Sequence, residues 1–178
     1  MGEHKLGVSS DGRPLHYSVG ALITKGGRYL LLDRVRKPFG FAGVAGHVEE
    51  GETPIEAIER EVKEESDLTS VTCQILFDEE VLWNGCSHGD FTHHWYLFKI
   101  DVEGMFFKLN AHAGKVMGWY TPEELAELNL EPVWRYWFER LKIIKKKDAA
   151  LSETFGKEKI TRKTEDILKE IDEEGWSD

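Results

Sequence analysis

Three glutamates in the first half of the chain have the spacing of a metal site. Glu61, Glu64 and Glu65 are three and four residues apart, so a helix would place them on one face. Like charges at this spacing destabilise an isolated helix by about 0.2–0.5 kcal/mol per pair. Glu52 precedes the expected helix, and the carbonyl of Gly46 could also approach an ion. Because Mg²⁺ favours carboxylate and carbonyl oxygens, the cluster predicts a divalent-cation site rather than only an acidic surface.

The residues around the glutamates predict a helix that could position them. Thr53 is a suitable N-cap, and Pro54 suits the first helical turn. Ile55, Ile58 and Val62 fall within one apolar stripe at helical spacing. We therefore expect a helix over residues 53–66 that packs on a sheet and directs its acids into an adjoining cleft.

This stretch resembles the signature of the Nudix hydrolases, which joins a glycine, a glutamate and an Arg-Glu-aliphatic-any-Glu-Glu run at fixed spacing. The matching residues are Gly46, Glu52, Arg60, Glu61, Val62, Glu64, Glu65 and Leu68. Asp67 replaces the family's glycine at the helix end, where a left-handed backbone is expected, and Asp tolerates that conformation better than most residues. The resemblance implies an α/β fold, a Nudix-type α/β/α sandwich with a mixed β-sheet.

The resemblance also implies an activity and a role for each matched residue. The expected reaction is hydrolysis of a phosphoanhydride bond in a nucleoside diphosphate derivative, with Mg²⁺ or Mn²⁺ as cofactor. The implied metal ligands are Gly46, Glu61, Glu64 and Glu65, while Glu52 and Arg60 orient them. Glu61 or Glu64 is expected as the general base. The alternative is an acid outside the motif: Asp78, Glu79, Glu80 or Glu103.

The substrate is left open by the sequence. The marks that some Nudix subfamilies carry after the motif, a proline or a tyrosine, are absent around Trp83-Asn84-Gly85. A MutT-like enzyme acting on a nucleoside triphosphate is the default expectation. The alternatives are an ADP-ribose or nucleotide-sugar pyrophosphatase, or a nucleotide-binding module without catalysis. An isoprenoid diphosphate isomerase is disfavoured, because residues 37–48 contain no cysteine.

A turn-rich loop from Trp83 to Asp90 is expected to border the substrate pocket. Trp83 offers an aromatic face on which a base could stack, and His88 is a second candidate for substrate binding. His93 and His94 are adjacent, so on a strand they point to opposite faces and cannot hold one ion together. No zinc site is therefore expected from these histidines, although one of them, or His112, could lie near the phosphates.

Composition narrows the class of protein. The 178 residues carry a net charge of −10, which disfavours binding to nucleic acid by bulk electrostatics. The two cysteines, Cys73 and Cys86, have no metal or redox spacing and suggest a reducing compartment. Residues 1–20 lack the apolar core of a signal peptide, and no run has the length of a membrane span. The expected location is the cytoplasm, with a small nucleotide as partner and a homodimer as a possibility.

The order of apolar runs and turns predicts three regions: a loose leader over 1–14, the Nudix domain over 15–147 and a polar extension over 148–178. Strands are expected at 16–24, 28–34, 41–48, 70–82, 91–101 and 116–120. Thr121 opens a short helix through a capping box, and a final helix with an apolar stripe runs from Pro132 to about Lys147. A further weak helix is expected over 158–173.

Overall fold

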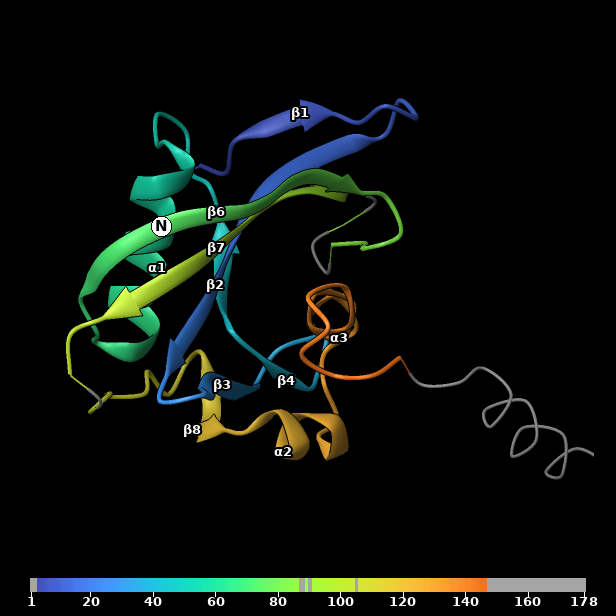
Figure 1. Ribbon diagram of the computed structural model, residues 1–178. Helices are drawn as coiled ribbons and strands as arrows, with labels where there is room; N and C mark the ends of the chain where they lie inside the picture. Colours follow the sequence, from blue (N-terminus) through green and yellow to red (C-terminus); the bar gives the residue numbers. More distant parts are fainter. Residues whose placement is uncertain (1–2, 87–88, 90, 105, 147–178) are drawn as a thin grey trace, which may run out of the picture. The chain divides into compact units, whose positions relative to one another are not determined.

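The computed structural model describes residues 3–86, 89, 91–104 and 106–146, and the chain divides into two units, 1–144 and 145–178. The helices and strands of the described residues belong to the first unit (Figure 1). The strands are β1 (Leu6–Val8), β2 (Pro14–Lys25), β3 (Arg28–Arg34), β4 (Phe41–Ala42), β5 (Val44–His47), β6 (Ser70–Val81), β7 (Thr92–Val102) and β8 (Gly114–Tyr120). The helices are α1 (Pro54–Ser66), α2 (Pro122–Glu127) and α3 (Pro132–Arg140). In the described part of the chain, no helix has the length and apolar character needed to cross a membrane.

The strands form one mixed sheet around β2. Its path runs β4-β3-β2-β7-β6, while β1 and β5 also pair with β2, and β8 pairs with β3. The pairing of β2 with β7 is parallel, and it joins Leu15–Ile23 to Thr92–Ile100. The other pairs are antiparallel, including the expected hairpin of β2 and β3. The parallel pair matters for function, because it brings residues far apart in sequence side by side.

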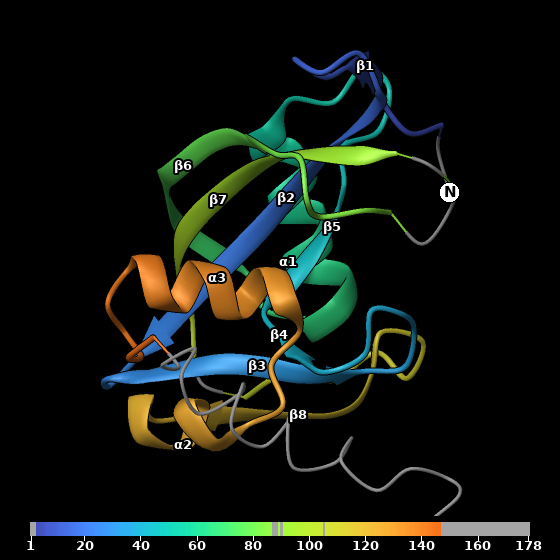
Figure 2. The same ribbon diagram turned by 90° about the vertical axis from the view of Figure 1, so that its right-hand side faces the viewer.

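Helices cover the sheet on two sides. Figure 2 shows α3 in front of β2 and β7, with α1 behind them. Val19, Ala21 and Ile23 of β2 pack in the core on the α1 side, whereas Leu22 packs with α3. This alternation follows from the two-residue period of a strand. The arrangement confirms the α/β/α sandwich with a mixed sheet.

The helix ends follow the local sequence. Thr53 and Glu56 form a capping box at the start of α1, and Thr121 and Glu124 form another at the start of α2. At the end of α1, Asp67 has φ 58° and ψ 11°, and its N–H donates to the carbonyl of Lys63. The expected left-handed helix end at this aspartate is therefore confirmed.

Some expectations differ from the structure. Within the leader predicted to be loose, β1 pairs with β2, and the Lys5 N–H donates to the Val48 carbonyl. Helix α3 ends at Arg140 instead of near residue 147. Ile55 is 50% exposed and does not join the buried stripe of α1, in which Ala57 takes its place. The helix expected over 158–173 lies outside the described residues.

Candidate active site

Helix α1 carries the three glutamates of the motif and packs against the sheet. Its buried residues Ala57, Ile58 and Val62 hold it against the sheet, and its capping box fixes where it begins. The local sequence thereby determines the rotation of the helix, and the acids lie beside the packed stripe.

Arg60 connects the acids of the motif. Its Nε and Nη2 donate to the two carboxylate oxygens of Glu52 at 2.7 and 3.0 Å. Its Nη1 donates to Glu61 Oε1 at 2.6 Å, and its Nη2 also donates to the backbone carbonyl of His47 at 3.0 Å. Glu52 accepts a further bond from the backbone N–H of Glu49. These contacts fix Glu61 and β5 relative to α1, as expected of residues that orient metal ligands.

Gly46 permits a close approach between β5 and α1. A Cβ atom at this position would lie 2.0 Å from Oε1 of Glu61, so any other residue here would displace the Glu61 carboxylate. The Glu61 carboxylate therefore lies directly against the Gly46 backbone. This proximity of a carboxylate and a backbone carbonyl suits a hard cation.

Glu65 is the most deeply buried acid of the three. Burial, reinforced by the negative charge of Glu61, raises the pKa of its carboxyl to about 8. Its Oε2 accepts the backbone N–H of Ala45 at 3.3 Å. Burial also raises the pKa of Glu61, although the Arg60 hydrogen bond opposes that shift. A bound cation would offset the cost of two buried, adjacent carboxylates.

Glu64 has different surroundings. Its side chain is 59% exposed, and its Oε2 lies 3.7 Å from Arg60 Nη1. Its backbone carbonyl accepts a hydrogen bond from the side chain of Asn110. Among Glu61, Glu64 and Glu65, Glu64 is the one whose carboxylate water reaches most readily.

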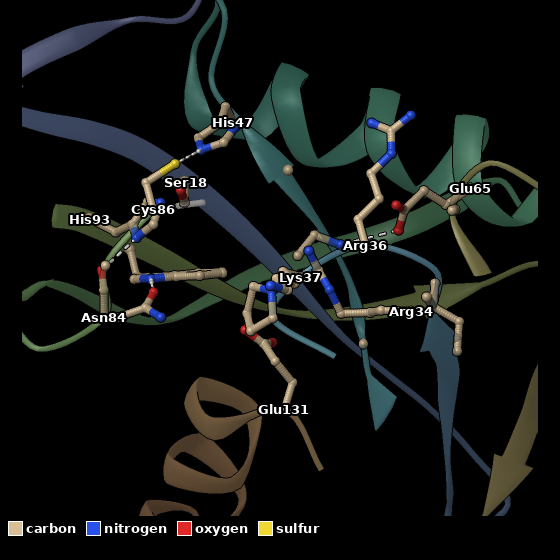
Figure 3. Close-up of a pocket in the computed structure, with 18 of the residues that line it drawn as sticks. Ser18, Arg34, Arg36, Lys37, His47, Glu65, Asn84, Cys86, His93 and Glu131 are labelled. Carbon is tan, nitrogen blue, oxygen red and sulfur yellow. Dashed lines mark hydrogen bonds between the residues drawn. The ribbon is translucent and has the colours of Figure 1, made fainter. Parts of the chain in front are cut away.

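A pocket of about 220 Å³ adjoins these residues. Figure 3 shows Glu65 at one end and the side chains of His47, Cys86 and His93 at the other. Three cationic residues also line it, namely Arg34, Arg36 and Lys37. Glu65, a carboxylate that could hold a cation, therefore shares one cavity with side chains that could pair with phosphates.

The loop after β6 contributes residues other than those expected. Asn84, Gly85 and Cys86 line the pocket, but Trp83 is not among its lining residues. The Trp83 side chain is 55% exposed and meets the Tyr136 ring edge to face at 5.4 Å. The described pocket thus gives no support to Trp83 as a stacking platform. His88, the second candidate, lies outside the described residues.

The acids proposed as alternative bases engage other partners. Asp78 bonds to His94 at 2.6 Å, Glu79 contacts Arg140 and Tyr136, and Glu80 accepts hydrogen bonds from the backbone N–H and the hydroxyl of Ser10. None of these three, nor Glu103, lines the described pocket. Helix α1 does reach the pocket, through Glu65, and this favours an acid of α1 over the alternatives.

Glu131 is a pocket residue that the sequence did not indicate. It is the N-cap of α3, yet its side chain makes no capping bond, and among the described atoms its Oε2 is buried without a hydrogen-bond partner. Burial raises the pKa of its carboxyl to about 7, while the positive charge of Arg34 opposes the shift. The capping position alone could not reveal that this carboxyl faces the pocket.

The raised pKa of Glu131 predicts a pH-dependent stability. Below pH 4.5, the ordinary pKa of a glutamate, the carboxyl is protonated in both the folded and the unfolded protein. Above about pH 7 it is charged in both, and the folded protein must bury that charge. The penalty therefore develops as pH rises through this window and reaches about 3 kcal/mol in the free energy of unfolding. Glu131→Gln should gain stability relative to wild type between pH 5 and pH 8. Urea unfolding at several pH values measures this gain, and Glu127→Gln, at an exposed glutamate, is the control. If the free energies of unfolding of Glu131→Gln and wild type differed by the same amount at pH 5 and pH 8, the prediction would be contradicted.

Comparisons with known proteins agree with this fold. A protein-family sequence model, described as the NUDIX domain, matches residues 14–141 of this chain. A Nudix hydrolase structure from Nitrosomonas europaea has 22% identity and a TM-score of 0.58, covering 75% of this chain and 98% of that one. A MutT protein from Methanosarcina mazei has 24% identity and a TM-score of 0.57, with coverages of 72% and 93%.

A third similar structure contains a ligand. The Nudix domain of NrtR from Shewanella oneidensis, complexed with ADP-ribose, has 12% identity and a TM-score of 0.62. The alignment covers 72% of this chain and 86% of that one. No curated protein matches this chain in sequence.

Proposed function

Because the chain belongs to the Nudix hydrolase family, we propose that it cleaves a phosphoanhydride bond of a nucleoside triphosphate with a divalent cation as cofactor. The observation that carries the proposal is the joint placement of Glu65, Gly46 and three cationic side chains around one pocket, with Glu61 against the Gly46 backbone. Phosphoryl chemistry depends mainly on positioning and on charge neutralisation, which these residues can supply.

The residues fit a bound Mg²⁺ or Mn²⁺. Glu61 and Glu65 are buried acids with raised pKa values, and Gly46 lacks the Cβ that would displace Glu61. With Glu64 and the Gly46 carbonyl they form an all-oxygen set, which hard cations prefer. When bound, the cation neutralises charge on the phosphates and activates water for attack on phosphorus.

The chain's own residues have distinct roles in this proposal. Arg60 and Glu52 hold Glu61 in place through the hydrogen bonds described above. Of the two acids expected as general base, Glu61 accepts a hydrogen bond from Arg60, whereas Glu64 is exposed to water. We therefore assign the general base to Glu64, because a base must reach the water whose proton it accepts.

The pocket also suggests how a nucleotide would bind. Its phosphates could pair with the cationic residues Arg34, Arg36 and Lys37. Its base could form a hydrogen bond with the unpartnered oxygen of Glu131. A nucleotide sugar is the second candidate, since the similar Nudix domain of NrtR is complexed with ADP-ribose. A binding module without turnover is the third.

A substrate panel with Mg²⁺ tests these possibilities. Nucleoside triphosphates should yield a nucleoside monophosphate and pyrophosphate, whereas ADP-ribose would yield AMP and ribose phosphate. Faster cleavage of ADP-ribose would replace the proposed substrate with the second candidate. Nucleotide binding by calorimetry without any product would instead support the module without catalysis. The Glu65→Gln protein is the control for contaminating hydrolases.

A further inference from the structure

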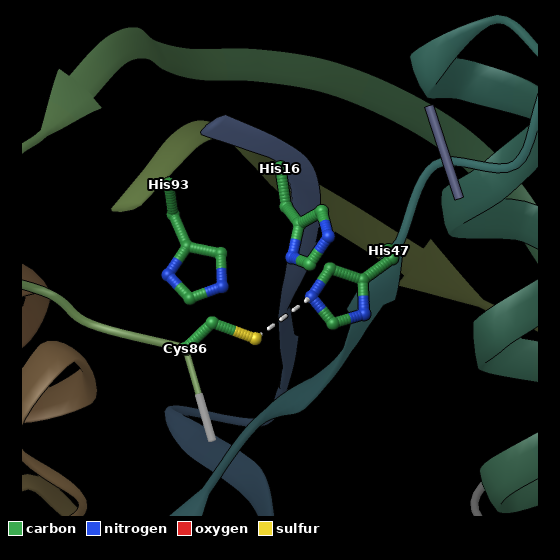
Figure 4. A group of neighbouring side chains, drawn as sticks. All are labelled: His16, His47, Cys86 and His93. Carbon is green, nitrogen blue, oxygen red and sulfur yellow. Dashed lines mark hydrogen bonds between the residues drawn. The ribbon is translucent and has the colours of Figure 1, made fainter. Parts of the chain in front are cut away.

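Three histidines and one cysteine meet at the end of the pocket opposite Glu65. They come from four separate segments: His16 from β2, His47 from β5, His93 from β7 and Cys86 from the loop after β6. One potential ligand atom of each lies within 4.8 Å of the corresponding atoms of the other three (Figure 4). His16 and His93 are 4% and 7% exposed, so the cluster is largely buried.

The sheet explains why these residues converge. His16 lies opposite His93 in the parallel pair of β2 and β7, and His47 lies opposite Ser18 in the pair of β2 and β5. Because His16 and Ser18 are two residues apart, all three histidines project from the same face of the sheet. His94 points to the other face and bonds to Asp78, as the alternation requires. The expectation that His93 and His94 do not share an ion stands, but His93 has partners on other strands.

The spacing is close to that of a tetrahedral metal site. Zinc bonds of about 2.0–2.1 Å to nitrogen and 2.3 Å to sulfur place neighbouring ligand atoms about 3.3–3.7 Å apart. Cys86 Sγ already lies 3.9 Å from His47 Nε2, within hydrogen-bond range for a thiol. Small side-chain movements would therefore bring the four atoms to bonding distance around one ion.

The surroundings orient the rings as metal ligands require. His93 Nδ1 donates to the backbone carbonyl of Asn84 at 2.8 Å. Because Nδ1 then carries the proton, the lone pair of Nε2 is available to bind an ion. A backbone carbonyl on the other nitrogen is the usual support of a metal-binding histidine. The His16 ring stacks on Phe91 with a centroid distance of 4.1 Å and an angle of 6°. Asn84 is itself held by Trp95 Nε1, which donates to its side-chain oxygen at 2.8 Å.

We propose that His16, His47, His93 and Cys86 bind one Zn²⁺ ion in a closed structural site. Three imidazoles and a thiolate are the ligands that zinc accepts and that Mg²⁺ does not favour. Binding releases the thiol proton of Cys86 to solvent, and four protein ligands complete the tetrahedron. The ion then ties the loop carrying Asn84 and Cys86 to β2, β5 and β7, and so fixes one wall of the pocket. This site is separate from the oxygen site on α1.

Metal analysis tests the proposal without relying on activity. After dialysis with excess Mg²⁺ to occupy the carboxylates, the protein should retain about one zinc per chain. Competition with a chromogenic chelator should show that Cys86→Ser weakens zinc binding about a hundredfold or more. Two variants are matched controls. Cys73→Ser changes the second cysteine, which lies on β6 outside the cluster, and His94→Gln changes the neighbour of His93 on the opposite face of the sheet. Both should bind zinc as wild type does.

Cobalt substitution reports the ligands directly. Co²⁺ in the wild-type protein should give the visible bands of tetrahedral geometry and a thiolate-to-cobalt charge-transfer band. Cys86→Ser should lose the charge-transfer band, whereas Cys73→Ser and Glu65→Gln should keep it. An octahedral spectrum, zinc binding that is equal in the two cysteine variants, or no zinc retention in wild type would each overturn the proposal. Because Glu65→Gln keeps the site, failure of the proposed hydrolysis would leave this result unaffected.

Discussion

Glu65→Gln should lower kcat by about a hundredfold or more, which corresponds to about 2.7 kcal/mol of transition-state stabilisation. The amide keeps the shape of the side chain but removes the charge that we assign to metal binding. The variant should stay folded, because the wild-type carboxylate is buried beside Glu61 and its charge opposes folding of the metal-free protein. Steady-state kinetics at saturating Mg²⁺ and thermal unfolding, measured on one preparation, check both expectations.

Two further variants make this test specific. Glu64→Gln should also lose about a hundredfold in kcat, since the exposed acid is the proposed base. Glu59→Gln changes an exposed glutamate of the same helix and should retain wild-type turnover. Near-normal turnover in both Glu64→Gln and Glu65→Gln would contradict the assignment of the metal site to α1.

Removal of divalent cations should abolish hydrolysis. The ligands assigned on α1 and β5 are all oxygens, so Mg²⁺ or Mn²⁺ is the expected cofactor, and without it the phosphate charge is not neutralised. Treatment with EDTA should reduce the rate to background, and excess Mg²⁺ should restore it. An equal ionic strength of monovalent salt is the control for screening.

The proposed zinc site requires a second arm in this experiment. EDTA would remove zinc as well, so activity should be measured with Mg²⁺ alone and with Mg²⁺ plus one equivalent of zinc. Recovery that needs both ions would show that the pocket wall depends on zinc. Full activity of a chelated protein in the absence of any divalent cation would refute the metal-dependent mechanism.

Local sequence was sufficient to predict α1 and its end. The capping box of Thr53 and Glu56, the proline that follows the cap and the left-handed Asp67 each depend on contacts between residues a few positions apart. The period of apolar residues also predicted most strands and the burial of Trp134, Trp137 and Phe138 in α3. The acids of the motif could be found for the same reason, because a helix converts their spacing directly into a shared face.

The length of α3 and the ordering of β1 were harder to predict from the sequence. The apolar stripe continues past Arg140, but Lys142 has φ 58°, which ends the helix there. The segment before β2 is polar, and its order comes from pairing with β2, which its own composition does not reveal. In both cases backbone geometry outside the periodic pattern decided the outcome.

The pocket and the histidine cluster were decided by tertiary structure alone. Glu131 could be read only as a helix cap, until the fold placed its carboxyl in the pocket. Similarly, His93 is adjacent to His94 in the sequence, whereas the side chains that cluster with it in the fold are on β2, β5 and the loop of Cys86. A parallel pair such as β2 and β7 joins strands through a long connection, so its register depends on global packing rather than on adjacent residues. The sequence by itself therefore determined helix α1 and the glutamates that it carries. The tertiary structure, and the sheet register above all, determined which distant histidines, cysteine and basic side chains surround the same cavity.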